Sequence, residues 1–301
     1  MGIDLKDRVA LITGAGGGLG RSHALLFAKL GAKVVVNDLG GSFDGSGQST
    51  SMADETVKLI QSKGGQAVTD YSSGDKMEGA EKMVQTALSA FGKLDIIVNN
   101  AGILRDVSFK KQTQDDWDRV FAVHANGSRN VTKAAWEHMN NQKYGRIVMT
   151  TSAAGLYGNF GQSNYSAAKL AILGLALTLE EEGAKNNIKV NTIAPIARSR
   201  MTETVLPPNI LEKLNPEYVS PVVAYFASEA CAVSGQCWSV GAGYVARVAI
   251  VEALGNYFPH DKGFTPDDIA AKLDAITKLE GAETFANVMA EVPRVMKNVK
   301  M

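Results

Sequence analysis

The amino-acid sequence predicts an α/β fold, namely a doubly wound parallel β-sheet with helices on both faces and a C-terminal extension. Short runs of branched apolar residues alternate with longer amphipathic segments from the start of the chain to Pro195. The runs lack polar alternation, as expected for strands that are buried on both faces. Right-handed crossovers between successive strands then produce a doubly wound sheet.

The expected elements follow from these runs in chain order. Six strands are predicted at 8–13, 33–38, 66–71, 93–102, 145–152 and 188–195, and five helices at 23–31, 53–65, 78–91, 115–142 and 165–177. Gly31 is a typical helix end. Gly and Ser dominate residues 39–53, which predicts an unusually long loop after the second strand.

Beyond Pro195 the pattern is looser. Residues 197–215 contain two prolines and predict a mobile loop over a site. A helix is expected at 216–230, and a last strand with its continuation at 237–248. Thr265 and Pro266 mark a helix start, and an apolar stripe from Phe285 to Val299, interrupted by Pro293, predicts core or a subunit contact. We therefore expect one domain at 1–250 and a helical extension at 251–301 packed on it.

Composition excludes several classes of protein. The 31 Lys and Arg residues balance the 31 Asp and Glu residues, which argues against nucleic acid as a partner. No apolar run approaches the roughly 20 residues that a membrane span needs. Met1 leads almost directly into the first strand, so no signal or transit peptide is expected. Cys231 and Cys237 lack companions for a disulfide framework or a metal site, and an intracellular, reducing setting is expected.

Three side chains predict acid–base chemistry on an alcohol or ketone. Tyr165 and Lys169 are four residues apart in a helical segment and should share one face. A nearby ammonium group is expected to lower the pKa of the Tyr165 phenol and make it a general base. Ser152 ends the fifth strand, where its hydroxyl can hold a substrate oxygen. The alternative is that Tyr165 and Lys169 simply lie on an exposed helix face.

A dinucleotide site is predicted at the first strand–helix turn. Residues 13–20 read T-G-x-x-x-G-x-G, a variant of the G-x-G-x-x-G dinucleotide fingerprint. The turn and the following helix N-terminus can hold a pyrophosphate. Asp38 ends the second strand, where a carboxylate binds ribose hydroxyls and repels a 2′-phosphate, so NAD is favoured over NADP. Tight packing at the glycines and a turn-forming role of Asp38 are the alternatives.

Together these motifs resemble the short-chain dehydrogenase/reductase family over about residues 5–245, with a Rossmann-type fold. The resemblance implies that Lys169 binds the nicotinamide ribose and lowers the pKa of Tyr165, while Ser152 polarises the substrate oxygen. The implied catalytic residues are Ser152, Tyr165, Lys169 and His124, with Ser152 and Tyr165 also binding substrate. The implied cofactor contacts are Gly14, Gly18, Leu19, Gly20, Asp38, Ser73, Asn100, Tyr165, Lys169, Ile196, Ala197 and Ser199.

Two positions depart from the family pattern. His124 occupies the place of a family Asn that holds a water in a proton relay, so it is either a relay member or an ordinary polar residue at a helix contact. Ile196 replaces the usual Gly after Pro195. Ser72 follows Tyr71 where a subgroup often has an acidic residue near the adenine, and Ser73 is the proposed substitute there.

Longer stretches, such as NNAGILRD and GLYGNFGQSNYSAAK, resemble the dehydrogenase units of type 2 peroxisomal multifunctional enzymes. The resemblance implies NAD-dependent oxidation of (3R)-3-hydroxyacyl-CoA in fatty acid β-oxidation, a homodimer, a downstream hydratase domain, and a peroxisomal location, otherwise cytoplasmic. The ending KNVKM lacks an S-K-L-type address. An NADPH-dependent ketoacyl reductase, a hydroxysteroid dehydrogenase, and a catalytically silent dinucleotide-binding assembly module remain as alternatives.

Overall fold

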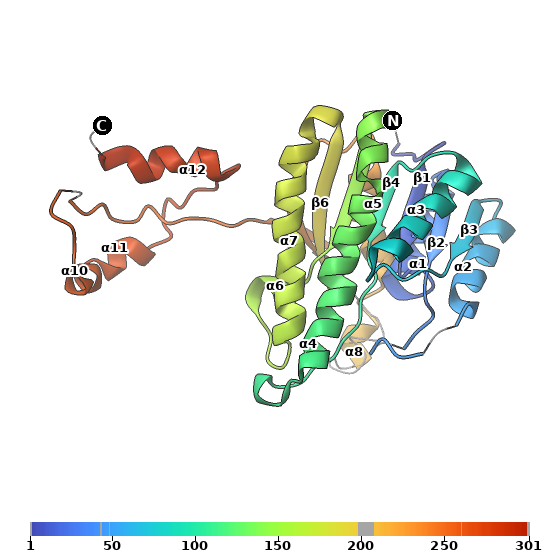
Figure 1. The fold of residues 1–301 in the computed structure, drawn as a ribbon, viewed down its shortest axis with the longest axis horizontal. Helices are drawn as coiled ribbons and strands as arrows, with labels where there is room; N and C mark the ends of the chain where they lie inside the picture. The colour runs from blue at the N-terminus through green and yellow to red at the C-terminus, as the bar shows by residue number, and fades with distance from the viewer. Residues whose placement is uncertain (1, 43, 48, 198–207, 260, 300–301) are drawn as a thin grey trace. The chain divides into compact units, whose positions relative to one another are not determined.

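The computed structural model describes the chain except for residues 1, 43, 48, 198–207, 260 and 300–301 (Figure 1). It divides into a larger unit, Met1–Arg247, and a smaller unit, Val248–Met301. Among the described residues, none of the helices combines the length and the apolar character that crossing a bilayer requires.

One eight-stranded sheet forms the centre of the larger unit, in the order β3-β2-β1-β4-β5-β6-β7-β8. All pairs from β3 to β7 are parallel. The strands are β1 Val9–Thr13, β2 Lys33–Asn37, β3 Gln66–Asp70, β4 Ile96–Asn99, β5 Gly145–Thr150, β6 Ile188–Pro195, β7 Cys237–Gly241 and β8 Tyr244–Val248. The predicted doubly wound sheet is confirmed. The run at 237–248 is a hairpin rather than one strand, because Ala242 and Gly243 take the positive φ angles of a tight turn.

Helices cover both faces of the sheet (Figure 1). One face carries α1 Gly18–Lys29, α2 Ser51–Ser62 and α9 Ser220–Ala227, and the other carries α3 Met77–Phe91, α5 Gly127–Gln142 and α7 Ser163–Gly183. Successive residues of each strand point to opposite faces. Accordingly Ala10 and Ile12 of β1 pack in the cluster beneath the first set of helices, and Val9 and Leu11 pack in the cluster beneath the second.

Several predicted helices have different bounds in the structure. The helix expected at 115–142 consists of α4 Gln114–Phe121, a π-helical turn at Ala122–Asn126, and α5. The helix expected at 216–230 is a 3₁₀ turn, Pro216–Tyr218, followed by α9. Two short helices, α6 Ala153–Tyr157 and α8 Pro208–Leu211, were not predicted. Most of the loop expected at 197–215 lies outside the described residues.

The smaller unit contains α10 Pro266–Ala271, α11 Leu273–Thr277 and α12 Val288–Val295. Thr265 caps α10 as predicted, since its hydroxyl accepts a hydrogen bond from the backbone N–H of Asp268. Pro293 lies inside α12 instead of interrupting the apolar stripe. Stripe residues Val288 and Met289 are exposed, so the stripe does not form the core of this unit.

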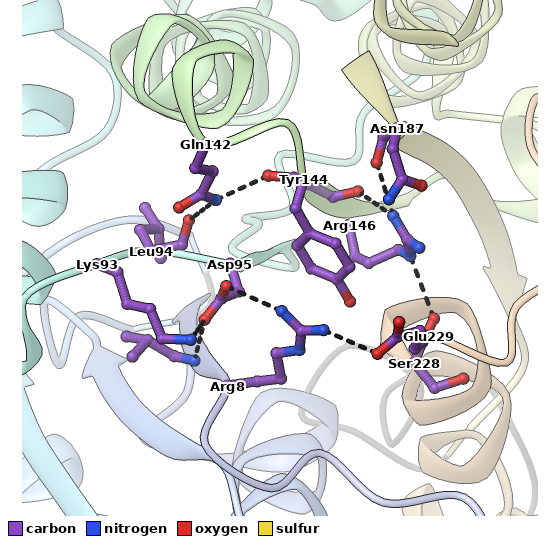
Figure 2. Close-up of polar contacts among 12 residues, drawn as sticks. Arg8, Lys93, Leu94, Asp95, Gln142, Tyr144, Arg146, Asn187, Ser228 and Glu229 are labelled. Carbon is purple, nitrogen blue, oxygen red and sulfur yellow. Dashed lines mark hydrogen bonds and ion pairs between the residues drawn. The ribbon is translucent and has the colours of Figure 1, made fainter. Parts of the chain in front are cut away.

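At the amino ends of the strands, a tyrosine ring lies between two arginines (Figure 2). The guanidinium carbons of Arg8 and Arg146 are 3.9 and 4.3 Å from the ring centroid of Tyr144. Arg146 is only 2% exposed and donates hydrogen bonds to the carbonyl oxygens of Gly145, Asn187 and Ser228. Arg8 pairs with Asp95 and Glu229. This cluster joins the starts of β1, β4, β5 and β6 at the edge opposite the site described below.

We predict that Tyr144→Leu lowers the free energy of unfolding by about 1–3 kcal/mol, because both cation–π contacts are lost, each worth about 0.5–2 kcal/mol. The matched variant Tyr144→Phe should be nearly neutral, since the buried hydroxyl has no hydrogen-bond partner among the described residues. Urea denaturation of both variants and the parent protein measures the difference. Equal destabilisation by Leu and Phe would show that the hydroxyl, not the ring, matters.

Candidate active site

A cavity of about 440 Å³ opens at the carboxyl ends of the strands. Strand order reverses between β1 and β4, which is where ligands bind in open α/β sheets. The cavity is lined by Gly14 after β1, Asp38 after β2, Asn100 after β4, Ser152 after β5 and Ala197 after β6. Its volume lies within the range of about 300–1,000 Å³ that small-molecule and cofactor sites occupy.

The glycine turn is shaped by close backbone approaches. Gly14 has a φ of +64°, and a Cβ there would lie 2.9 Å from Cα of Ala101. A Cβ on Gly20 would lie 2.1 Å from the Gly14 carbonyl oxygen, so Gly20 lets α1 pack under the turn. Gly14, Gly18 and Leu19 line the cavity, whereas Gly20 is not among its lining residues. α1 starts after Gly17 with no side-chain cap, which leaves N–H groups for an anion.

Asp38 orders the glycine turn and also lines the cavity. Its carboxylate accepts hydrogen bonds from the backbone N–H of Gly16 at 2.8 Å and of Gly40 at 2.7 Å. The second bond is the turn contact of the alternative interpretation. Because Asp38 also lines the cavity, the carboxylate is positioned both to order the turn and to face a ligand.

Asn100 and Ser73 both line the cavity. The Asn100 side-chain amide donates to the carbonyl oxygens of Thr13 at 3.0 Å and Gly14 at 3.2 Å, which ties the end of β4 to the glycine turn. The hydroxyl of Ser73 donates to Asp75 at 2.6 Å. Asn100 therefore holds the shape of the turn, and Ser73 lies on the cavity wall next to an acidic side chain.

Ser152, Tyr165 and Lys169 face the same cavity from two elements. Ser152 caps α6, accepting a hydrogen bond from the backbone N–H of Ala154 at 3.2 Å. Tyr165 and Lys169 share one face of α7, with the Lys169 Nζ 5.6 Å from the Tyr165 ring centroid. Lys169 is 3% exposed, and its Nζ donates to the carbonyl oxygen of Thr150 at 2.7 Å. The helical spacing therefore places the phenol and the amine side by side.

The pKa of Tyr165 is raised, whereas the sequence predicted that Lys169 lowers it. Burial raises the pKa of the Tyr165 phenol to about 12, although a hydrogen bond with Ser152 lowers it and the charge of Asp106 raises it further. Burial also lowers the pKa of Lys169 to about 7. The sequence-based expectation was wrong for the cofactor-free protein, because desolvation of the buried phenol is the largest cause of the shift and Lys169 is not among its causes.

His124 lies in the π-helical turn and points toward the end of β4. Its Nε2 lies 2.8 Å from the carbonyl oxygen and 3.1 Å from the backbone nitrogen of Ile103. Its ring meets the Tyr165 ring edge-on at 5.2 Å. Burial lowers the pKa of His124 well below its usual range, and the charge of Lys169 lowers it further. The imidazole is therefore neutral, and its buried Nδ1 has no hydrogen-bond partner among the described residues.

The end of β6 contributes fewer residues to the cavity lining than the sequence predicted. Ala197 lines the cavity together with Pro195, but Ile196 does not and is 44% exposed. Ser199 lies outside the described residues. Sequence reasoning missed several lining residues, among them Leu39, Gly45, Asp75, Asp106, Arg119, Thr150, Asn159 and Gln162. Thr150, two residues before Ser152, could have been found from its place at a strand end; the others come from loops and helices that only the fold brings together.

The lining residues fit a dinucleotide. The uncapped start of α1 suits a pyrophosphate, and Asp38 suits the adenosine ribose. Lys169 and the buried Thr150 hydroxyl, which has no hydrogen-bond partner among the described residues, add polar groups to the cavity that Tyr165 also lines. A phenol, a serine hydroxyl and an amine in one partly closed cavity can move a proton to or from an alcohol oxygen.

Comparisons with known proteins identify the family of this chain. The short chain dehydrogenase family model matches residues 8–208. Peroxisomal multifunctional enzyme type 2 of Mus musculus is 57% identical over 82% of this chain and 33% of its own length. A putative short-chain type dehydrogenase/reductase of Mycobacterium tuberculosis is 52% identical over 93% of this chain and 97% of its own length.

The solved structure of full-length peroxisomal multifunctional enzyme type 2 from Drosophila melanogaster superposes with a TM-score of 0.83 and 37% identity. The match covers 99% of this chain and 50% of that one. The chain thus spans a third to a half of these multifunctional relatives, and nearly the whole of the mycobacterial one. On the family match and these identities, the chain belongs to the short-chain dehydrogenase family.

Proposed function

We propose that this chain is an NAD-dependent dehydrogenase that oxidises (3R)-3-hydroxyacyl-CoA to 3-ketoacyl-CoA in fatty acid β-oxidation. The observation that carries the proposal is that Ser152, Tyr165 and Lys169 line one cavity with the glycine turn and Asp38. The substrate rests on the similarity of this chain to part of the multifunctional enzymes.

In the proposed reaction the Tyr165 hydroxyl, as phenolate, removes the proton from the substrate alcohol. The Ser152 hydroxyl donates a hydrogen bond to the same oxygen and keeps it beside the phenol. Lys169 holds the nicotinamide ribose and supplies positive charge near Tyr165. When bound, an oxidised nicotinamide would accept hydride, and its positive charge would favour the phenolate.

We further propose that His124 continues the proton path in place of the family Asn. The neutral imidazole has a buried Nδ1 without a partner among the described residues, and this atom can form a hydrogen bond with a water next to Lys169, as donor or acceptor according to the tautomer. Both side chains lie against Tyr165: its ring centroid is 5.2 Å from that of His124 and 5.6 Å from the Lys169 Nζ.

The test of the proposed function is kinetic. The protein is assayed with (3R)- and (3S)-3-hydroxyacyl-CoA of several chain lengths, with NAD and with NADP, by absorbance of the reduced cofactor. Preference for the 3R substrate with NAD supports the proposal. NADPH-driven reduction of ketoacyl thioesters would instead indicate a ketoacyl reductase, and turnover of steroids alone a hydroxysteroid dehydrogenase. Cofactor binding without turnover of any substrate would indicate a silent assembly module.

Cofactor choice gives a separate prediction for Asp38. Asp38→Asn removes the charge that would repel a 2′-phosphate, so the ratio of kcat/KM with NAD to kcat/KM with NADP should fall roughly tenfold. Glu78→Gln, which removes an exposed charge outside the cavity, is the control. An unchanged ratio in Asp38→Asn would contradict the proposed contact between Asp38 and the adenosine ribose.

We also propose a homodimer through the two long helices α5 and α7, which lie side by side on one face of the sheet (Figure 1). Leu170 and Leu177 of α7 are exposed, and a Cβ on Gly174 between them would meet open space. Gly inside a helix lowers the stability of that helix relative to Ala. Here it lies in an exposed apolar stripe, where the missing side chain lets another helix approach closely. Sedimentation analysis tests the dimer. A peroxisomal location is proposed on the names of the relatives alone, and a downstream hydratase domain on the name of one of them, the peroxisomal hydratase-dehydrogenase-epimerase of Saccharomyces cerevisiae.

A further inference from the structure

Among the polar side chains that line the cavity without a part in the proposed mechanism, three are joined by hydrogen bonds: Asp106, Asn159 and Gln162. Asp106 follows β4, and the other two lie between α6 and α7. A backbone hydrogen bond of 2.8 Å from Val107 N to the Gly161 carbonyl oxygen joins the two loops. Because Asp106 and Asn159 line the cavity and are also exposed, this amide-binding strip, as we call the three residues, lies at the cavity opening.

Hydrogen bonds within the strip orient its groups. The Gln162 Nε2 donates to Asp106 Oδ2 at 2.6 Å, and the Asn159 Nδ2 donates to Gln162 Oε1 at 2.9 Å. The Gln162 amide is therefore held at both ends. Asp106 Oδ1 and Asn159 Oδ1 accept no hydrogen bond from the described residues, so the strip offers these two acceptors to a ligand, beside the second N–H of each side-chain amide.

The strip is also close to the catalytic phenol. The negative charge of Asp106 contributes to the raised pKa of Tyr165. Partial burial raises the pKa of Asp106 itself, while the bond from Gln162 lowers it. Asp106 lines the same cavity as Ser152 and Tyr165 and is exposed, so a ligand whose alcohol oxygen lies between Ser152 and Tyr165 can extend past Asp106 toward solvent.

We propose that the amide-binding strip recognises the amide N–H groups of the pantetheine arm of a hydroxyacyl thioester. This inference rests on the proposed function. The arm leaves the reacting carbon through the thioester and carries secondary amides, whose N–H donors match the acceptors Asp106 Oδ1 and Asn159 Oδ1. An acyl chain or a steroid ring system has no such donors. Coenzyme A and acyl carrier proteins share this arm, so the strip serves either carrier.

The test compares thioesters of 3-hydroxybutyrate with and without amides. The substrates are the coenzyme A thioester, the N-acetylcysteamine thioester, which keeps one amide, and the S-ethyl thioester, which has none. Asp106→Ala should lower the ratio of kcat/KM for each amide-containing thioester to kcat/KM for the S-ethyl thioester by tenfold or more, mainly through KM. A hydrogen bond to a charged group has this strength. Asp106→Asn, which keeps an acceptor oxygen, should retain most of the ratio.

Asp118→Ala is the matched control, since Asp118 is exposed on α4 and does not line the cavity; it should leave the ratio unchanged. An equal loss on all three thioesters in Asp106→Ala would overturn the inference and assign Asp106 a structural role. The failure of the proposed function looks different: the parent protein would then turn over none of the three thioesters with either cofactor.

Discussion

Tyr165→Phe is expected to lower kcat for alcohol oxidation by about 100- to 10,000-fold, the usual contribution of a general acid or base. The substitution removes only the hydroxyl that would take the substrate proton. The ring contact with His124 is kept, so the shape of the cavity should persist. Steady-state rates with the hydroxyacyl thioester measure the loss, and fluorescence titration with NADH should show nearly unchanged cofactor binding.

Tyr157→Phe is the matched control, because Tyr157 is 73% exposed and lies outside the cavity lining. It should leave both the rate and the cofactor affinity as they are. If Tyr165→Phe keeps more than a few per cent of the parent rate, another group is the base. Loss of NADH binding together with activity would instead mean that the hydroxyl serves the fold of the site.

The fold was predictable because the first strands are continuous apolar runs and helical segments separate the strands up to β6. β1 and β2 were found from VALIT and KVVVN, whose burial on both faces requires such runs. The π-helical turn at Ala122–Asn126 was not predictable, because an extra residue in a helix depends on what the turn packs against. Here the turn contains His124, which bonds to Ile103.

The site was predictable to the extent that it is local in sequence. Helical spacing brought Tyr165 and Lys169 together, and the strand–turn–helix pattern located the glycine turn. The direction of the Tyr165 pKa was wrong because burial is set by the whole fold rather than by the four-residue spacing. The bond between Asp106 and Gln162 joins residues 56 positions apart, and no local pattern indicates it.

Lys169→Met is expected to stabilise the cofactor-free protein near neutral pH while it abolishes turnover. Burial lowers the pKa of Lys169 from 10.5 to about 7. Between these values the unfolded chain binds the proton and the folded protein does not. Unfolding therefore becomes more favourable as pH falls from 10.5 to 7, by about 1.4 kcal/mol per pH unit for this group. The stability that depends on Lys169 is fully present above 10.5 and fully lost below 7.

Methionine carries no proton, so Lys169→Met should be more stable than the parent by roughly 2–4 kcal/mol near pH 7, after the loss of the hydrogen bond to Thr150. Near pH 10 the two proteins should be almost equal. Urea denaturation across this range measures the difference, and Lys133→Met, an exposed lysine on α5, is the control. If the free energies of unfolding of parent and variant differed by the same amount at every pH, Lys169 would keep its charge in the folded protein. We expect the free energies of unfolding of the two proteins to converge as the pH rises toward 10. That result would mean that the folded protein keeps an amine that destabilises it, because turnover needs the charge of that amine.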